Sequence, residues 1–172
     1  MKELFPFYSI GHFINQPNNP TEFEITRFDE MEEPDVDDLH KHTFYEIIWI
    51  EKGKSRQVID HVEYEISPGS LFFISPGQLH IFEEWRPVMG GSIMFTENFF
   101  LLNYLDKDKL FELSFLDNFY SHPVLRPNKS SFVEIQQTIH AIDKEKRRKD
   151  SLVSMMQALL HILLLQIQRC VD

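Results

Sequence analysis

Two histidines and a glutamate lie close together in the stretch LHKHTFYEIIWIEKG. His40 and His42 are two residues apart, and Glu46 follows four residues after the second histidine. In an extended strand every second residue lies on the same face, so these three side chains would point the same way. Imidazole and carboxylate groups in that arrangement are ligands for a divalent metal ion. They are equally suited to hydrogen-bond a polar small molecule.

A further histidine follows in the stretch GSLFFISPGQLH, where Ser75 to Gly77 are predicted to turn the chain before a strand that begins at His80. The side chains that could hold a metal are therefore His40, His42, Glu46 and His80. The side chains predicted to line a ligand pocket are these four together with apolar residues of the same parity: His40, His42, Phe44, Glu46, Ile48, His80 and Phe82. Metal binding, pocket lining and structural hydrogen bonding all remain open, and no catalytic residue is assigned.

Short strands are predicted to position these residues. Up to Phe95 the sequence shows brief apolar or alternating stretches separated by Pro, Gly, Asn and Asp. The pair Asp60 and His61 joins two alternating runs, as a tight hairpin would. The predicted strands are Phe23–Phe28, Phe44–Ile50, Ser55–Ile59, Val62–Ile66, Leu71–Ile74, His80–Glu83 and Gly91–Phe95. Strands at this spacing are typical of a sandwich or barrel. Tyr45 and Trp49 are expected to pack against covering helices.

After Phe95 the periodicity becomes helical. Thr96 could cap a short helix that reaches Leu102, and Lys107–Leu116 is expected to form another turn or two of helix. The segment SHPVLRPN is expected to be extended. Ser131 and Glu134 form a capping-box pattern that predicts the start of the next helix, with an apolar stripe at Phe132, Ile135, Ile139 and Ile142.

The last predicted helix starts at Asp150 or Ser151 and reaches about Arg169. It is apolar around most of its circumference, whereas a helix packed on one side needs only a stripe. A homodimer is therefore predicted, with an interface formed by Leu152, Met156, Leu160, Leu163, Leu164 and Ile167. The alternative is a helix that is wholly internal to one chain.

Composition excludes several classes of protein. The chain has 172 residues and a formal charge of -10, and its one strongly basic run, Lys144 to Lys149, is expected to be a solvated helix face rather than a nucleic-acid site. Cys170 is the single cysteine, so no disulfide can form within the chain. The N-terminus lacks the features of a signal peptide, and the apolar run Leu152 to Ile167 is interrupted by polar residues. A cytoplasmic location is expected, without membrane or direct nucleic-acid contact.

The two histidine segments resemble the motifs of the cupin family. The first reads H-x-H-x3-E-x6-G, and the second reads G-x5-P-x-G-x2-H, with Ser75 in place of the usual first proline. Pro34 and Glu84 also depart from the cupin pattern, but neither replaces a ligand. More narrowly, His40 to His80 resembles the amino-terminal sensing and dimerisation domain of AraC-type transcriptional regulators, and the leucine-rich last helix extends that resemblance to the end of the chain.

The resemblance implies a mainly β fold, a cupin-type double-stranded β-helix (jelly-roll barrel) followed by an antiparallel helical pair. The implied divisions are an N-terminal arm or edge segment (1–20), the barrel (21–95), a connection of short helices and an extended segment (96–127), and a two-helix dimerisation segment (128–172). The implied function is to bind a small-molecule effector, a sugar or another metabolite, and to control helix-turn-helix heads that this chain lacks. The chain would then be an isolated regulatory domain or a truncated piece of a longer regulator.

No cofactor is expected for a sensor of this kind. The alternative is a metal-dependent cupin enzyme, a dioxygenase or isomerase, that holds Fe, Mn, Ni or Zn at His40, His42, Glu46 and His80. A third reading is an interaction module whose barrel is filled by side chains.

Overall fold

A computed structural model describes residues 5–36, 38–101, 112–117 and 122–171. The elements run in the order β1 (Phe7–Tyr8), α1 (Ile10–Phe13), β2 (Phe23–Arg27), β3 (Lys41–His42), β4 (Tyr45–Lys52), β5 (Ser55–Ile59), β6 (Val62–Ile66), β7 (Leu71–Ile74), β8 (His80–Phe82), β9 (Met89–Phe95), α2 (Glu97–Leu101), the 3-10 turn η2 (Ser114–Leu116), β10 (Val124–Leu125), α3 (Lys129–Lys146) and α4 (Val153–Val171). All of the predicted strands are present, and their ends differ from prediction by at most two residues.

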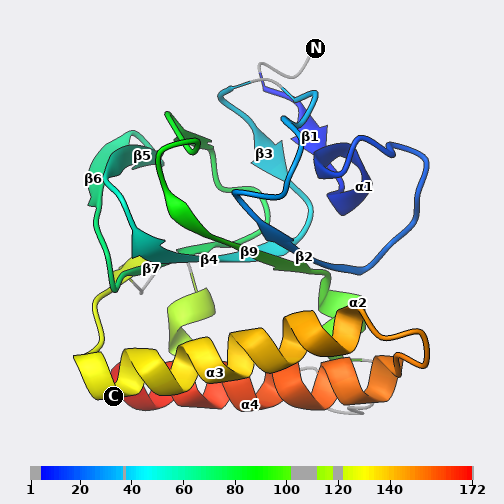
Figure 1. Cartoon of the computed structure of the whole chain (residues 1–172). Coiled ribbons are helices and arrows are strands. Elements are labelled where there is room, and N and C mark those ends of the chain that lie inside the picture. Colours follow the sequence, from blue (N-terminus) through cyan, green and yellow to red (C-terminus); the bar gives the residue numbers. More distant parts are fainter. Residues whose placement is uncertain (1–4, 37, 102–111, 118–121, 172) are drawn as a thin grey trace.

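The strands form two main sheets. An antiparallel sheet has the order β10-β7-β4-β9-β2, and a second one has the order β6-β5-β8, while β1 and β3 form a small parallel pair. The three-stranded sheet and the β1–β3 pair lie on one side of the five-stranded sheet, and α3 and α4 cover the other side (Figure 1). The predicted class, a mainly β, cupin-like fold with C-terminal helices, is confirmed.

The predicted hairpin at Asp60 and His61 is confirmed between β5 and β6. Both residues have positive φ angles, 48° and 68°, as a two-residue type I′ turn requires. The Asp60 carboxylate also accepts hydrogen bonds from the side chain of Gln78 and the backbone of Leu79. The turn therefore fixes the segment that leads into His80.

Alternate residues of β4 enter different apolar cores. Ile47 and Trp49 belong to the larger cluster, which lies between the five-stranded sheet and the helices. Ile48 and Ile50 belong to a smaller cluster on the opposite face, together with Phe28 of the chain that follows β2. The predicted parity of this strand, including the burial of Trp49 on the helical side, is confirmed.

The helical layer consists of α3 and α4, which run antiparallel and side by side (Figure 1). The predicted helix start at a Ser131 capping box is wrong, because Asn128 is the N-cap and its side chain accepts a hydrogen bond from the backbone of Ser131. Asn is as strong an N-cap as Ser, and here it lies one turn earlier. The predicted stripe of Phe132, Ile135, Ile139 and Ile142 is buried, as expected.

The predicted dimer interface is wrong for five of its six residues. Met156, Leu160, Leu163, Leu164 and Ile167 are buried in the larger core of the chain itself. These side chains are buried within the chain because α4 packs against α3, α2 and η2. Leu152 alone of the predicted set is exposed, at 58%. The exposed apolar side chains of α4 are different ones: Val153, Met155, Ile162, Leu165 and Val171.

Some of the predicted segments lie partly outside the described residues. Of the helical turns predicted over Lys107–Leu116, residues 107–111 lie outside the described part, and Ser114–Leu116 is a 3-10 turn. Ser121 of the expected extended segment and residues 1–4 of the N-terminal segment also lie outside it. Within the remainder of that segment, β1 pairs with β3 and Ile10 of α1 is buried. Among the described helices, none is long and apolar enough to cross a membrane.

Candidate functional site

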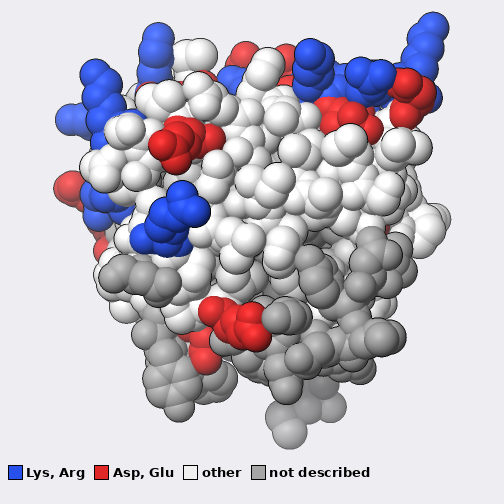
Figure 2. Space-filling model, turned by 90° about the horizontal axis from the view of Figure 1, so that it is seen from below, with Lys and Arg blue, Asp and Glu red and all other residues white. Residues whose placement is uncertain are grey.

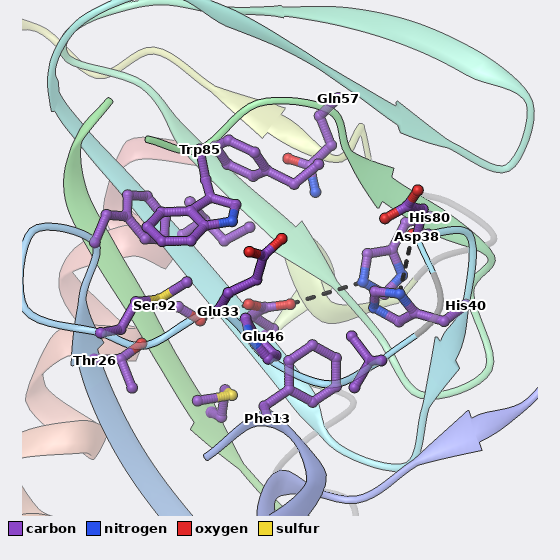
Figure 3. A pocket seen from close by; sticks show the side chains of 17 residues that line it. Phe13, Thr26, Glu33, Asp38, His40, Glu46, Gln57, His80, Trp85 and Ser92 are labelled. Atoms are coloured by element: carbon purple, nitrogen blue, oxygen red, sulfur yellow. Dashed lines mark hydrogen bonds and ion pairs between the residues drawn. The ribbon is translucent and has the colours of Figure 1, made fainter. Parts of the chain in front are cut away.

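A cavity of about 830 Å³, including its open mouth, lies on the face of the five-stranded sheet that is turned away from the helices. Its wall contains five of the seven side chains predicted to line a pocket: His40, Glu46, Ile48, His80 and Phe82. Figure 3 shows the imidazoles of His40 and His80 near one end of this space and Trp85 near the other, with Glu46 between them.

The remaining two predicted side chains, those of His42 and Phe44, do not form the cavity wall, so the prediction is wrong for them. Their rings are stacked, with centroids 3.9 Å apart and planes inclined by 7°. Both are fully buried because Phe13 of α1 packs against them. His42 still acts on the site, because its Nε2 lies 3.1 Å from Oε2 of Glu46.

The predicted histidines and glutamate do converge. One nitrogen of His42, one of His80 and a carboxylate oxygen of Glu46 all lie within 4.8 Å of one another. Glu46 and His80 come from facing sheets, and Nε2 of His80 is 3.9 Å from Oε2 of Glu46. Paired backbone hydrogen bonds between His40 and His80, of 3.2 and 3.0 Å, hold these two residues opposite each other. His40 lies outside the tight group of three but its ring centroid is 4.5 Å from that of His80.

Backbone contacts orient two of the imidazoles. Nδ1 of His40 lies 3.1 Å from the carbonyl oxygen of Asp38, and Nδ1 of His80 lies 3.1 Å from that of Gln78. A carbonyl oxygen can only accept, so each Nδ1 carries the proton and donates. In the neutral ring the lone pair is then on Nε2. This is the arrangement that a metal ligand or a hydrogen-bond acceptor needs.

Glu46 is an ionised carboxylate at neutral pH. Burial alone would raise its pKa, but the hydrogen bond and electrostatic attraction from His42 and the hydrogen bond from Ser92 outweigh burial and lower the pKa to about 2. For His80, burial is the largest effect and lowers the pKa to about 3, with His42 and His40 acting in the same direction. The site therefore combines a carboxylate with a neutral imidazole.

An aromatic wall faces this polar group across the cavity. The rings of Phe28 and Phe82 meet edge to face with centroids 5.4 Å apart, and Trp85 lies 6.4 Å from Phe28. Gln57 of β5 also lines the cavity and is 0% exposed. Neither Nε2 nor Oε1 of Gln57 has a hydrogen-bond partner in the described part of the chain. A buried amide without partners costs free energy, which a bound polar group would recover.

The loop after β2 forms part of the mouth of the cavity, through Met31, Glu33 and Asp38. Ion pairs attach it to two other regions: Glu33 pairs with Arg86, and Glu30 pairs with Arg147 at the end of α3. The guanidinium of Arg86 also lies over the ring of Trp85, 5.0 Å from its centroid. The cavity mouth is thereby connected to the helical layer.

Sequence reasoning missed several residues of the wall, including Phe13, Gln57, Trp85 and Ser92. Gln57 could have been found, because it alternates with Ile59 on an inward face of its strand. Ser92 could not, because its hydrogen bond to Glu46 depends on how β9 pairs with β4. The positions of Phe13 and Trp85 depend on segments outside the two main sheets.

Part of the chain matches a known protein family. Residues 24–84 match the family described as the AraC-like ligand binding domain. No curated protein matches the chain. Two similar solved structures are the AraC-like transcriptional activator CuxR, with 15% identity and a TM-score of 0.47, and an apo form of ToxT from Vibrio cholerae, with 14% identity and a TM-score of 0.46.

The CuxR alignment covers 75% of this chain and 42% of CuxR, and the ToxT alignment covers 88% of this chain and 57% of ToxT. The chain thus spans about half the length of these regulators. A variant of oxalate decarboxylase from Bacillus subtilis is similar at 12% identity and a TM-score of 0.33, over 65% of this chain and 35% of that protein. The match over residues 24–84, which contain His40, Glu46, Gln57 and His80, confirms the predicted resemblance to the ligand-binding domain of AraC-type transcriptional regulators.

Proposed function

We propose that this chain is the effector-sensing and dimerisation domain of an AraC-type transcriptional regulator, located in the cytoplasm. The observation that carries the proposal is the cavity, which combines a polar group at one end with an aromatic wall at the other. A cavity with a few convergent polar groups and an apolar lining is the usual form of a small-molecule site. In the whole regulator, the bound effector would control attached helix-turn-helix heads that read DNA.

The pKa values of Glu46 and His80 disfavour general acid or base catalysis by these two groups. A general acid or base works best when its pKa lies near the working pH. The pKa of Glu46 is lowered to about 2 and that of His80 to about 3, so neither group exchanges a proton readily at neutral pH. Both are instead suited to present fixed hydrogen-bond acceptors.

A ligand screen tests the sensing role. Thermal unfolding of the chain is followed in the presence of sugars, amines, alcohols and carboxylic acids. A sensor is expected to yield a ligand that raises the unfolding temperature of the wild type and of Val62→Glu, an exposed control on β6, but has little effect on Glu46→Gln. If no ligand raises the unfolding temperature of the wild type, the sensing role is contradicted.

The dimer is proposed to form through the exposed side of α4. Met155, Ile162 and Leu165 are 46%, 47% and 49% exposed, and their spacings of seven and three residues place them along one face of a helix. Figure 2 shows the side of the molecule that carries the helices, with a broad uncharged surface in its middle and most of the charged residues near its rim. Exposed apolar patches of this kind mark association surfaces.

Light scattering tests the dimer. At a concentration on the order of tens of micromolar, the wild type is expected to have the mass of a dimer, because biological dimers are commonly this tight or tighter. The double variant Ile162→Glu, Leu165→Glu is expected to be monomeric and folded, because both side chains are exposed. Val62→Glu should remain dimeric. A monomeric wild type would contradict the proposal.

The second candidate function is that of a metal-dependent cupin enzyme, and the convergence of His42, Glu46 and His80 favours it. The backbone-oriented His40 and His80 fit a metal, whereas Nε2 of His42 would have to exchange its contact with Glu46 for the ion. A bound Fe, Mn, Ni or Zn ion would supply Lewis acidity. Elemental analysis after loading with each metal tests this candidate: a stoichiometric ion that is lost in His80→Ala would favour the enzyme.

A further inference from the structure

We propose that the effector is an organic amine whose protonated nitrogen binds Glu46 and the imidazoles of His40 and His80, with its apolar body against Trp85, Phe28 and Phe82. This inference rests on the proposed sensing function, because it names the chemical class of ligand for the same cavity. It follows from the direction of the hydrogen bonds, the charge of the wall and the position of the aromatic rings.

The polar end of the cavity offers lone pairs. His40 and His80 each donate from Nδ1 to a backbone carbonyl, so the neutral form of each ring has its lone pair on Nε2. Glu46 accepts from Ser92 through one oxygen and from Nε2 of His42 through the other, which also lies 3.9 Å from Nε2 of His80. An alkylammonium group has three N–H donors and no acceptor, which matches this set.

The charge of the wall favours a cation. Three carboxylates line the cavity, those of Glu33, Asp38 and Glu46, and its described wall contains no Lys or Arg. Glu33 is compensated by Arg86, which lies outside that wall, whereas Glu46 is buried among imidazoles. A buried carboxylate is strongly stabilised by a paired cation, and a ligand carboxylate would be repelled.

The aromatic end of the cavity is suited to contact the apolar body of the ligand. Trp85 and Phe28 line the cavity, and Figure 3 shows Trp85 toward the end that is opposite His40 and His80. Gln57 supplies a second polar contact, because its fully buried amide lacks partners among the described residues. A hydroxyl or amide on the ligand could both donate to Oε1 and accept from Nε2 of Gln57.

Other ligands of the cavity fit less well. Each hydroxyl of a polyol needs donors as well as acceptors, and the Nε2 atoms and Glu46 provide acceptors. A divalent metal would use the same lone pairs but would leave the aromatic wall and Gln57 unused. The experiment must therefore separate an amine from an alcohol, an acid and a metal.

Three probes with one skeleton make this separation: 2-phenylethylamine, 2-phenylethanol and phenylacetate. Their binding to the whole chain is measured by isothermal titration calorimetry at pH 7 in buffer with EDTA. We expect the amine to bind at least about ten-fold more tightly than the alcohol, since charge-assisted hydrogen bonds are roughly twice as strong as neutral ones. Phenylacetate should bind more weakly than the alcohol.

The variant Glu46→Gln keeps the size of the side chain and removes its charge. It should weaken binding of the amine by more than about ten-fold and change binding of the alcohol by less than about three-fold, because the alcohol carries no charge to be paired. Glu63→Gln, an exposed carboxylate on β6, is the matched control and should change neither. Circular dichroism establishes that each variant is folded, and the three-probe comparison on the wild type stands even if Glu46→Gln does not fold.

The outcomes distinguish this inference from the sensing role itself. Tighter binding of the alcohol or of phenylacetate overturns the amine proposal and leaves a sensor. Amine binding that is unchanged in Glu46→Gln also overturns it. Without EDTA, a stoichiometric Mn²⁺ or Zn²⁺ ion that prevents amine binding assigns the lone pairs to a metal instead. If neither these probes nor the wider ligand screen shows binding, both proposals fail.

Discussion

The two faces of the five-stranded sheet are built for different purposes, although the same strands supply both. On the helical face, Ile47 and Trp49 join a continuous apolar core that includes most of the buried side of α4. On the opposite face, Glu46 alternates with these residues and lies in a cavity with Gln57 and His80. One residue step along β4 thus separates close packing from an open polar site.

The comparison teaches where stability and function are located. The helical face contributes by burying apolar area, in which a lost methylene group is costly. The cavity face holds a buried amide and unfilled volume, each of which costs free energy in the absence of a ligand. Proteins tolerate such costs mainly at functional sites. A substitution that removes one of these costs should therefore stabilise the chain, whereas the loss of a packed side chain on the helical face should destabilise it.

The largest effect is expected on the helical face. Leu163 is fully buried in the larger core, so Leu163→Ala should lower the free energy of unfolding by about 2–5 kcal/mol. Its neighbour Ile162 is 47% exposed, and Ile162→Ala should change the free energy by about 0.5 kcal/mol or less in the monomer. Urea unfolding measures both. Equal effects for the two would mean that the orientation of α4 described above is wrong.

A pH-dependent effect comes next, on the cavity face. The pKa of Glu46 is lowered from 4.5 to about 2, so its carboxylate stabilises the folded chain above pH 4.5 and this contribution is lost as the pH falls toward 2. Glu46→Gln should cost about 1–3 kcal/mol at pH 7, and the difference from the wild type should shrink over that pH range. Urea unfolding between pH 7 and pH 3 measures it. A difference that is constant with pH would contradict the assignment.

A smaller and opposite effect is expected for Gln57. Its fully buried amide lacks partners among the described residues, so Gln57→Leu should raise the free energy of unfolding by about 1 kcal/mol in the absence of ligand. Thermal unfolding measures the change. The control Gln78→Leu should destabilise the chain, because Gln78 hydrogen-bonds Ser75 and Asp60. Destabilisation by Gln57→Leu would mean that the amide has a structural role.

The smallest effect on stability is expected for the ion pair that joins the helical layer to the loop at the cavity mouth. Arg147 and Glu30 form an exposed ion pair between α3 and the loop at the cavity mouth, so Arg147→Ala should change the free energy of unfolding by less than about 1 kcal/mol. Amide hydrogen exchange in residues 28–36 should nevertheless become faster, because the loop loses an attachment. Lys149→Ala, an exposed change beyond the end of the helix, is the control. Unchanged exchange would show that the ion pair does not hold the loop.

Much of the fold could be predicted from the sequence because it depends on local patterns. Alternation identified the strands, and the parity of β4 correctly separated Glu46 and Ile48 from Ile47 and Trp49. The spacing of His42 and Glu46 placed these two side chains on one face, and they contact each other in the structure. Each of these inferences needs only periodicity within a strand and a short connection.

The rest depends on contacts between distant segments. Leu160, Leu163 and Leu164 were assigned to a dimer because the sequence does not show how much of α4 its own domain covers. Phe44 was assigned to the cavity because parity does not show that α1 packs Phe13 on that side. Trp85 lies in an irregular segment after β8, where no periodicity indicates its direction.

The two main sheets both contribute side chains to the cavity, and this has a consequence for the whole molecule. Glu46 and Ser92 belong to the five-stranded sheet, whereas Gln57 and His80 belong to the three-stranded sheet. A ligand held by both groups cross-links the two halves of the sandwich, so these halves cannot separate until the ligand leaves. By mass action, occupancy would then delay global unfolding rather than local fraying, and slow hydrogen exchange would extend to strands that never touch the ligand.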